Sequence, residues 1–130
     1  IETDKEVMKL AQSNMKKVEK IMGKKLNGEF LNVDIKEFDK KVDVIIQNPP
    51  FGVKETHMDK LFLIKAMELS KKIYSFHKSS TKDFINKFIG ENGFKVVKQY
   101  HYKFPLKQKF WFHTSRIKYI DVGCWYIRKA

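Results

Sequence analysis

Cysteine, proline and long apolar runs are scarce in this sequence of 130 residues, which has one Cys and three Pro. A lone cysteine, Cys124, excludes an internal disulfide and a zinc site built from several cysteines, and the histidines are too scattered to suggest a metal site. Because Cys124 lies among Val122, Trp125 and Ile127, we expect it to be a small apolar strand residue. No apolar stretch reaches the ~18 residues that span a membrane, and the first residues lack a signal-peptide pattern. These absences predict a soluble, cytoplasmic protein without a membrane partner.

Acidic residues are also in short supply. The chain has 27 Lys and Arg against 15 Asp and Glu, a net charge of +12. This excess indicates a polyanionic partner such as nucleic acid, with an ordinary lysine-rich surface as the alternative. From Lys98 to Arg116, basic side chains that can bind phosphates are interleaved with aromatic side chains that can stack on unpaired bases. The middle of this segment is a candidate nucleic-acid surface, with Lys109, Phe110, His113 and Arg116 as its contact residues.

Alternating helical and strand patterns predict an α/β fold. Asp4 is a candidate N-cap for a helix that runs to about Met22. Further helices are expected over 58–72 and from Ser80 or Thr81 to Ile89, and strands over 29–33, 42–46, 73–77, 94–103 and 117–128. The last two strands should pair antiparallel across a loop that contains Pro105. The order predicts a doubly wound, mostly parallel sheet with an antiparallel C-terminal hairpin, in a single domain over residues 1–130.

A glycine-rich turn is missing as well. A doubly wound domain that binds a nucleotide-like ligand ordinarily has a strand and a Gly-rich turn before its first helix. This chain begins at what looks like the end of a strand, and it contains no Gly-x-Gly pattern. We expect the first strand and its loop to lie upstream of Ile1; a degenerate half-domain is the alternative.

The most informative motif is Asn48-Pro49-Pro50-Phe51, which follows the predicted strand 42–46. Ligands of open α/β sheets bind beyond the carboxyl ends of strands, where this motif lies. The two prolines stiffen the backbone of Asn48 and Pro49 and have no N–H that needs a partner. An exocyclic amine could donate one hydrogen to the Asn48 side-chain oxygen and one to the Pro49 carbonyl oxygen, with Phe51 stacked on an unstacked base. The motif predicts transfer of a methyl group to such an amine; a Pro-Pro turn with Phe51 in the core is the alternative.

The same motif after an apolar strand resembles motif IV of class I amino-methyltransferases. More narrowly, the chain is similar to archaeal and eukaryotic methyltransferase-like enzymes that methylate N6 of an adenine in small-subunit ribosomal RNA. The resemblance covers essentially the whole chain and rests on residues 44–52, 57–63, 74–79, 104–105 and 110–113. The family's Gly-rich methionine-binding loop has no counterpart in it.

The resemblance implies a Rossmann-like class I methyltransferase fold, truncated at its N-terminus, that uses S-adenosylmethionine. It implies that Glu2 binds the ribose hydroxyls of the cofactor and that Asp34, with Ile35 alongside, reaches the cofactor adenine. Asn48 would serve both the cofactor and catalysis, together with Pro49, Pro50 and Phe51. The alternative for Glu2 and Asp34 is two ordinary strand-end carboxylates. A small zinc-binding activator protein is a possible partner of such enzymes.

Lys78 and Ser79 follow the predicted strand 73–77 and could hold a substrate phosphate, although a helix cap beside a solvated lysine is the alternative. The predicted function is therefore methylation of an adenine N6 amine in RNA, with ribosomal RNA as the substrate that the resemblance implies. DNA adenine methylation, protein glutamine methylation and a non-enzymatic basic RNA-binding fragment are the alternatives.

Overall fold

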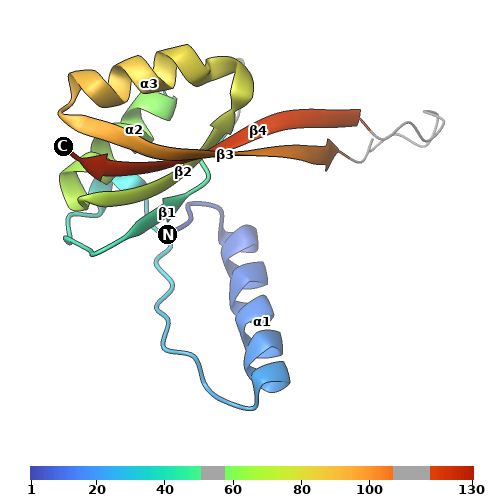
Figure 1. Ribbon diagram of the computed structural model, residues 1–130. Helices are drawn as coiled ribbons and strands as arrows, with labels where there is room; N and C mark the ends of the chain where they lie inside the picture. The colour runs from blue at the N-terminus through green and yellow to red at the C-terminus, as the bar shows by residue number, and fades with distance from the viewer. Residues whose placement is uncertain (51–57, 107–117) are drawn as a thin grey trace. The chain divides into compact units, whose positions relative to one another are not determined.

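The computed structural model describes residues 1–50, 58–106 and 118–130. The chain forms two units, Ile1–Asp39 (unit 1) and Lys40–Ala130 (unit 2). Figure 1 shows the helices and strands of both. No helix within the described ranges is long and apolar enough to cross a membrane.

Unit 1 contains one α-helix, α1 (Lys5–Met22), which begins and ends where the sequence predicts. The Asp4 side chain caps it by accepting hydrogen bonds from two backbone N–H groups of the first turn, at 2.8 and 3.1 Å. The helix ends at Gly23, whose φ of 65° is left-handed and whose N–H donates to the Glu19 carbonyl oxygen. Local sequence signals thus determine both ends of this helix.

The segment after α1 is extended but forms no strand, so the predicted strand over residues 29–33 is wrong. A backbone hydrogen bond of 3.1 Å joins the Glu2 N–H to the Leu31 carbonyl oxygen. The Asn32 side-chain amide donates to the carbonyl oxygens of Glu2 and Thr3, at 2.8 and 3.0 Å. A β-ladder requires repeated hydrogen bonds between two backbones, and here the Asn32 side chain makes two of the bonds in place of a backbone N–H.

Unit 2 contains a four-stranded sheet in the order β1-β2-β4-β3. Its strands are β1 (Ile45–Gln47), β2 (Lys72–Lys78), β3 (Phe94–Leu106) and β4 (Lys118–Lys129). β1 and β2 run parallel, whereas β4 pairs antiparallel with both β2 and β3. The α/β class and the C-terminal antiparallel hairpin are therefore confirmed, while the parallel part of the sheet in the described residues is small.

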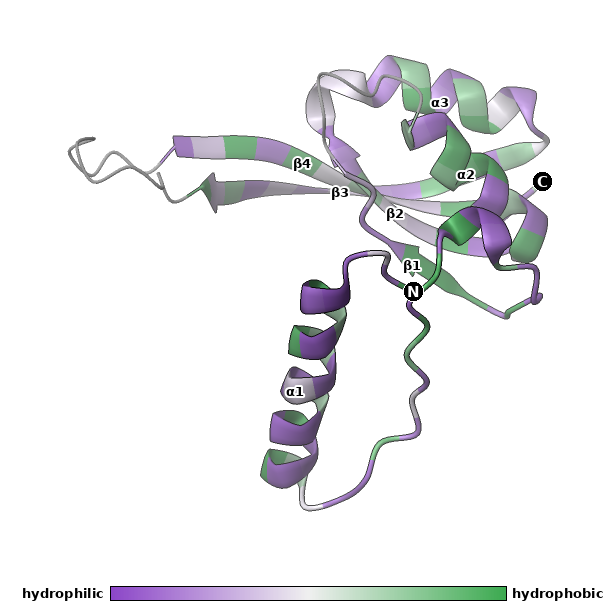
Figure 2. Ribbon diagram, turned by 180° about the vertical axis from the view of Figure 1, so that it is seen from behind, coloured by the Kyte–Doolittle hydropathy of each residue, from purple (hydrophilic) through white to green (hydrophobic). Residues whose placement is uncertain are grey.

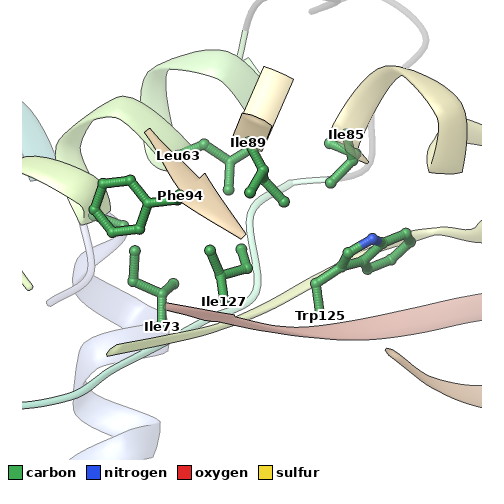
Figure 3. Close-up of a cluster of buried hydrophobic side chains, with 8 residues drawn as sticks. Leu63, Ile73, Ile85, Ile89, Phe94, Trp125 and Ile127 are labelled. Carbon is green, nitrogen blue, oxygen red and sulfur yellow. The ribbon is translucent and has the colours of Figure 1, made fainter. Parts of the chain in front are cut away.

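Two α-helices lie on one face of this sheet (Figure 1). They are α2 (Met58–Leu69) and α3 (Lys82–Glu91), the second preceded by a 3-10 turn, η2 (Ser79–Thr81). Figure 3 shows the core between the sheet and these helices, with the Trp125 ring at one end of it. The Trp125 Nε1 atom donates to Asn86 Oδ1 at 2.8 Å, which satisfies the indole N–H. The core consists of Leu63, Ala66, Ile73, Ile85, Ile89, Phe94, Trp125 and Ile127.

Gly123 of β4 shows why the strand has a glycine beside this core. A Cβ atom at this position would lie 2.7 Å from the Cη2 atom of the Trp125 ring and 3.0 Å from Gln99 Nε2. The Trp125 ring therefore occupies the space that any other residue would need. The neighbouring Cys124 is buried, as predicted for a strand residue, and burial raises the pKa of its thiol.

Two local predictions for unit 2 are wrong, and a third is correct only in part. Pro105 lies within β3, opposite Tyr119, instead of in a loop, because β3 is an edge strand in which a missing N–H is tolerated. Thr81 is the N-cap residue of α3, as predicted, but its hydroxyl donates to the Lys78 carbonyl oxygen at 2.8 Å and makes no capping hydrogen bond with the helix. Ile46, expected in a strand buried on both faces, is 75% exposed because it points to the sheet face opposite α2 and α3.

Candidate active site

The motif residues Asn48 and Pro49 lie directly beyond the carboxyl end of β1. Because β1 and β2 are parallel, with Gln47 opposite Ser75, the carboxyl ends of both strands meet at one edge of the sheet. At this edge Asn48 is exposed, whereas Pro49 is fully buried. The exposed Asn48 is thus followed by a buried proline ring, which fixes the backbone at Pro49.

The predicted phosphate-binding residues lie at the same edge. Lys78 is the last residue of β2 and Ser79 begins η2, and both are half-buried. The structure therefore places five of the predicted site residues of unit 2 at or beyond the carboxyl ends of two neighbouring strands, with β2 extending past the end of β1 to Lys78. These are Asn48, Pro49, Pro50, Lys78 and Ser79.

Hydrogen bonds also hold the start of β1, which is a strand of only three residues. The Ser70 hydroxyl, between α2 and β2, donates to the Asp43 carbonyl oxygen at 3.0 Å. The same hydroxyl oxygen accepts a hydrogen bond from the Lys72 N–H at 3.1 Å. The Val42 N–H donates to the Leu69 carbonyl oxygen at 3.0 Å. The chain that leads into the motif is thus tied to the turn between α2 and β2.

A chain of polar side chains lies next to the motif. Gln47 Nε2 donates to Ser75 Oγ at 2.9 Å, and Ser75 Oγ lies 2.6 Å from His77 Nε2. On the other side of the imidazole, His77 Nδ1 lies 3.5 Å from Asp59 Oδ1, a distance that suits electrostatic attraction more than a hydrogen bond. Ser75 and His77 are 0% exposed.

The surroundings of His77 control its charge. Burial lowers the pKa of His77 below its ordinary value, and the negative charge of Asp59 opposes part of this shift. The Trp125 ring contributes to the burial, since it meets the imidazole edge-on with 5.5 Å between ring centroids. The His77 side chain is therefore neutral at pH 7.

Sequence analysis assigned no role to Ser75, His77 or Asp59. The alternation over residues 73–77 contains a signal for the first two, because it places Ser75 and His77 on the same strand face as the core residue Ile73. Polar residues at two successive core positions indicate a buried polar contact. The part played by Asp59 depends on how α2 packs on the sheet, which no local pattern encodes.

In unit 1 the predicted cofactor-binding residues Glu2 and Asp34 each use one carboxylate oxygen locally. Glu2 Oε1 accepts from the Asp4 N–H at 2.9 Å, and Asp34 Oδ1 accepts from a backbone N–H at 2.8 Å as the cap of η1 (Ile35–Glu37). The described residues form no hydrogen bond to the second oxygen of either carboxylate. Each can therefore accept a hydrogen bond from a ligand hydroxyl or amine, with the half-buried Ile35 beside Asp34.

Other predicted site residues lie outside the described residues. These are Phe51, Lys109, Phe110, His113 and Arg116. In the part of the chain that the structure covers, no group of three or more His, Cys, Asp or Glu side chains is arranged to hold a metal ion.

Comparison with solved structures identifies the class of fold. A candidate RNA methyltransferase of Pyrococcus horikoshii, PH1948, matches 98% of this chain with a TM-score of 0.75 and 35% identity, and the match covers 60% of that structure. The chain therefore has the Rossmann-like fold of methyltransferases, which confirms the predicted fold class.

Curated sequences give particular relatives. The chain is 33% identical to the uncharacterized protein MJ0284 of Methanocaldococcus jannaschii, over 99% of this chain and 62% of that protein. It is 37% identical to the rRNA N(6)-adenosine-methyltransferase Mettl5 of Drosophila melanogaster, over 68% of this chain and 43% of that protein. The chain thus spans less than two thirds of the relatives it matches. No family model matches it.

Proposed function

We propose that the chain is the catalytic part of an S-adenosylmethionine-dependent methyltransferase that methylates the N6 amine of an adenine in RNA. The observation that carries the proposal is the exposed Asn48 beside the buried Pro49, at the sheet edge where α/β folds bind ligands. The methyltransferase fold supports the reaction class. Ribosomal RNA is the substrate class named for the relative Mettl5, which supports it as the RNA.

Asn48 and Pro49 would act by orientation. The N6 amine would donate one hydrogen to Asn48 Oδ1 and the other to the Pro49 carbonyl oxygen, so that its lone pair faces the methyl group. The nitrogen would form a bond to the methyl carbon as the bond between that carbon and the donor sulfur breaks, which leaves a neutral thioether, and the nitrogen would then release one proton to water. No charged base beside the amine is needed, which agrees with the neutral Gln47, Ser75 and His77 behind the motif.

S-adenosylmethionine, when bound, would supply a methyl group on a positively charged sulfur, and one methyltransferase of this fold, 13% identical to this chain, has been solved with it bound. The free carboxylate oxygens of Glu2 and Asp34 are suited to its ribose hydroxyls and adenine amine, with Ile35 against the ring.

A net charge of +12 supports RNA as the substrate over a protein glutamine. Lys78 and Ser79 lie at the same sheet edge as Asn48 and would hold a phosphate of the RNA. The roles of Lys109, Phe110, His113 and Arg116, the zinc-binding activator protein and the cytoplasmic location stay predictions from the sequence.

The experiment is a product analysis with the full chain. The protein would be incubated with S-adenosylmethionine that carries an isotopically labelled methyl group. Parallel reactions would contain rRNA, DNA of the same sequence, or a glutamine-containing peptide. We expect label in N6-methyladenosine from the RNA, identified by mass spectrometry of the nucleosides. Label in DNA or in glutamine instead would overturn the choice of substrate. Tight RNA binding without any methyl transfer would favour a non-enzymatic RNA-binding role.

A further inference from the structure

Two side chains of β2, Ser75 and His77, connect the residue before the motif to helix α2, which follows it. Gln47, which directly precedes the motif, donates to Ser75 Oγ at 2.9 Å. Asp59, in the first turn of α2, lies 3.5 Å from His77 Nδ1. Ser75 Oγ and His77 Nε2 are themselves 2.6 Å apart. The buried Ser75–His77 pair therefore contacts both residues that flank the segment 48–58, Gln47 before it and Asp59 after it.

Packing alone does not account for this pair. Ser75 and His77 are fully buried on the core face of β2, on the same side as Ile73. Apolar side chains would be buried there without the free-energy cost of removing polar groups from water. Ser75 Oγ and His77 Nε2 have hydrogen-bond partners that lead to the motif, whereas the buried His77 Nδ1 has no hydrogen-bond partner among the described residues and faces the Asp59 carboxylate at 3.5 Å.

Asp59 sets the direction of the hydrogen bonds. Its carboxylate lies 3.5 Å from His77 Nδ1 and favours the imidazole hydrogen on that nitrogen. In a neutral imidazole Nε2 is then an acceptor, so the Ser75 hydroxyl donates to Nε2 while Ser75 Oγ accepts from the Gln47 amide nitrogen.

We propose that Ser75 and His77 are positioning residues for methyl transfer. His77 Nε2 holds the Ser75 hydroxyl in one direction, Ser75 holds the Gln47 side chain, and the backbone that carries Asn48 therefore leaves β1 at a fixed angle. The inference rests on the proposed function, because it assigns these residues a role at the same site.

Protonation of His77 would break this arrangement. Nε2 would become a donor, and the Ser75 hydroxyl hydrogen would lose its acceptor in a fully buried place. Among the described residues, α2 presents Asp59 to the imidazole, β4 presents Trp125 and β2 presents Ser75. Asp59 is thus the titratable group that faces His77 there.

A matched pair of variants tests the role in catalysis. His77→Phe keeps an aromatic ring against Trp125 but removes the acceptor for Ser75, whereas the side-chain oxygen of His77→Gln can accept that hydrogen bond and cannot titrate. We expect His77→Phe to lower kcat for RNA methylation by about 100-fold, the order of effect of a small misplacement of reacting groups, with KM for RNA unchanged. We expect His77→Gln to restore most of kcat and to remove the fall in kcat on the acidic side of the pH profile.

A merely structural role gives a different result. Both variants would then lose activity in proportion to the unfolded fraction, measured by circular dichroism at the assay temperature, and the pH profile would keep its shape. Wild-type kcat in folded His77→Phe would also overturn the inference.

An NMR titration of the full chain tests the hydrogen-bond chain without turnover. With ¹⁵N-labelled histidine, we expect His77 to carry its hydrogen on Nδ1 at pH 7, and Ser75→Ala to shift the backbone and side-chain amide signals of Asn48. A hydrogen on Nε2, or unchanged Asn48 signals in folded Ser75→Ala, would overturn the inference. A wild-type chain with the expected signals but no methyl transfer would contradict the proposed function and leave the hydrogen-bond chain standing.

Discussion

The polar side chains in and around the predicted site residues are held in different ways in unit 1 and unit 2. In unit 1 the carboxylates of Glu2, Asp4 and Asp34 accept from backbone N–H groups two or three residues further along the chain. In unit 2 the hydrogen bond between Gln47 and Ser75 joins residues 28 positions apart. The first arrangement is encoded locally, whereas the second exists only once helices and strands have packed.

The two units also differ in what they bury. Hydrophobic residues in α1 alternate with hydrophilic ones (Figure 2), and Leu10 and Ile21 are 58% and 85% exposed. In unit 2 the core includes Trp125, which is 0% exposed. Substitutions should therefore be costly in unit 2 and mild in unit 1, and this difference can be tested.

The largest expected effect is that of Trp125→Ala. Truncating a fully buried tryptophan lowers the free energy of unfolding by about 3–5 kcal/mol, and here Asn86 also loses its partner. Ile21→Ala in α1 is the matched control and should change stability by less than about 0.5 kcal/mol, as exposed positions do. Urea denaturation followed by circular dichroism measures both. Equal effects would erase the contrast between the units.

Much of unit 1 was predictable because its signals are local. The cap at Asp4 and the glycine at Gly23 determine the ends of α1. The strand expected over 29–33 failed because strand formation depends on a partner, and the Asn32 side chain supplies bonds that a backbone ladder would have made.

In unit 2 the position of Asn48 and Pro49 was predictable from an apolar strand followed by the motif, because strand ends bind ligands in this class of fold. The Ser75–His77 pair was visible only as polar residues at core positions. The approach of Asp59 and the place of Gly123 under the Trp125 ring depend on tertiary packing, which periodicity does not encode.

Two glycines of unit 2 should respond with opposite signs. Gly123→Ala forces the Trp125 ring to move and should lower the free energy of unfolding by about 1–3 kcal/mol. Gly90→Ala, within α3, meets no atom within 4 Å and should raise stability by about 0.5–1 kcal/mol through helix propensity. The midpoints of urea denaturation of the two variants, compared at equal m-value, test these opposite changes in stability. A harmless Gly123→Ala would show that the packing around Trp125 is loose.

A smaller effect is expected from the cap of α1. Asp4→Ala removes the acceptor for two backbone N–H groups and should lower the stability of the helix by about 1 kcal/mol. The loss should appear in the helical signal of circular dichroism in urea, with Thr3→Ala as the neighbouring control. A signal identical to wild type would mean that contacts beyond the cap determine where α1 begins.

The smallest effect near neutral pH concerns His77. Its pKa is ordinary in the unfolded chain and lower in the folded one, so the unfolded state binds more protons as the solution is acidified. Stability is therefore complete above the ordinary histidine pKa and falls as pH decreases through the folded-state pKa. The free energy of unfolding, measured in urea from pH 7.5 to 5, should fall more steeply for wild type than for His77→Gln. Parallel curves would show that His77 is not buried in its neutral form.

The central claim is that Asn48 holds the substrate amine, and the rate of N6-methyladenosine formation in a single turnover tests it most directly. Asn48 is exposed, so Asn48→Ala should leave the free energy of unfolding and the affinity for RNA unchanged. The account predicts a rate lower by about 100-fold or more for Asn48→Ala, since orientation of the amine is lost. Asn48→Asp, which keeps an accepting oxygen, should retain more activity. A wild-type rate in Asn48→Ala would contradict the account.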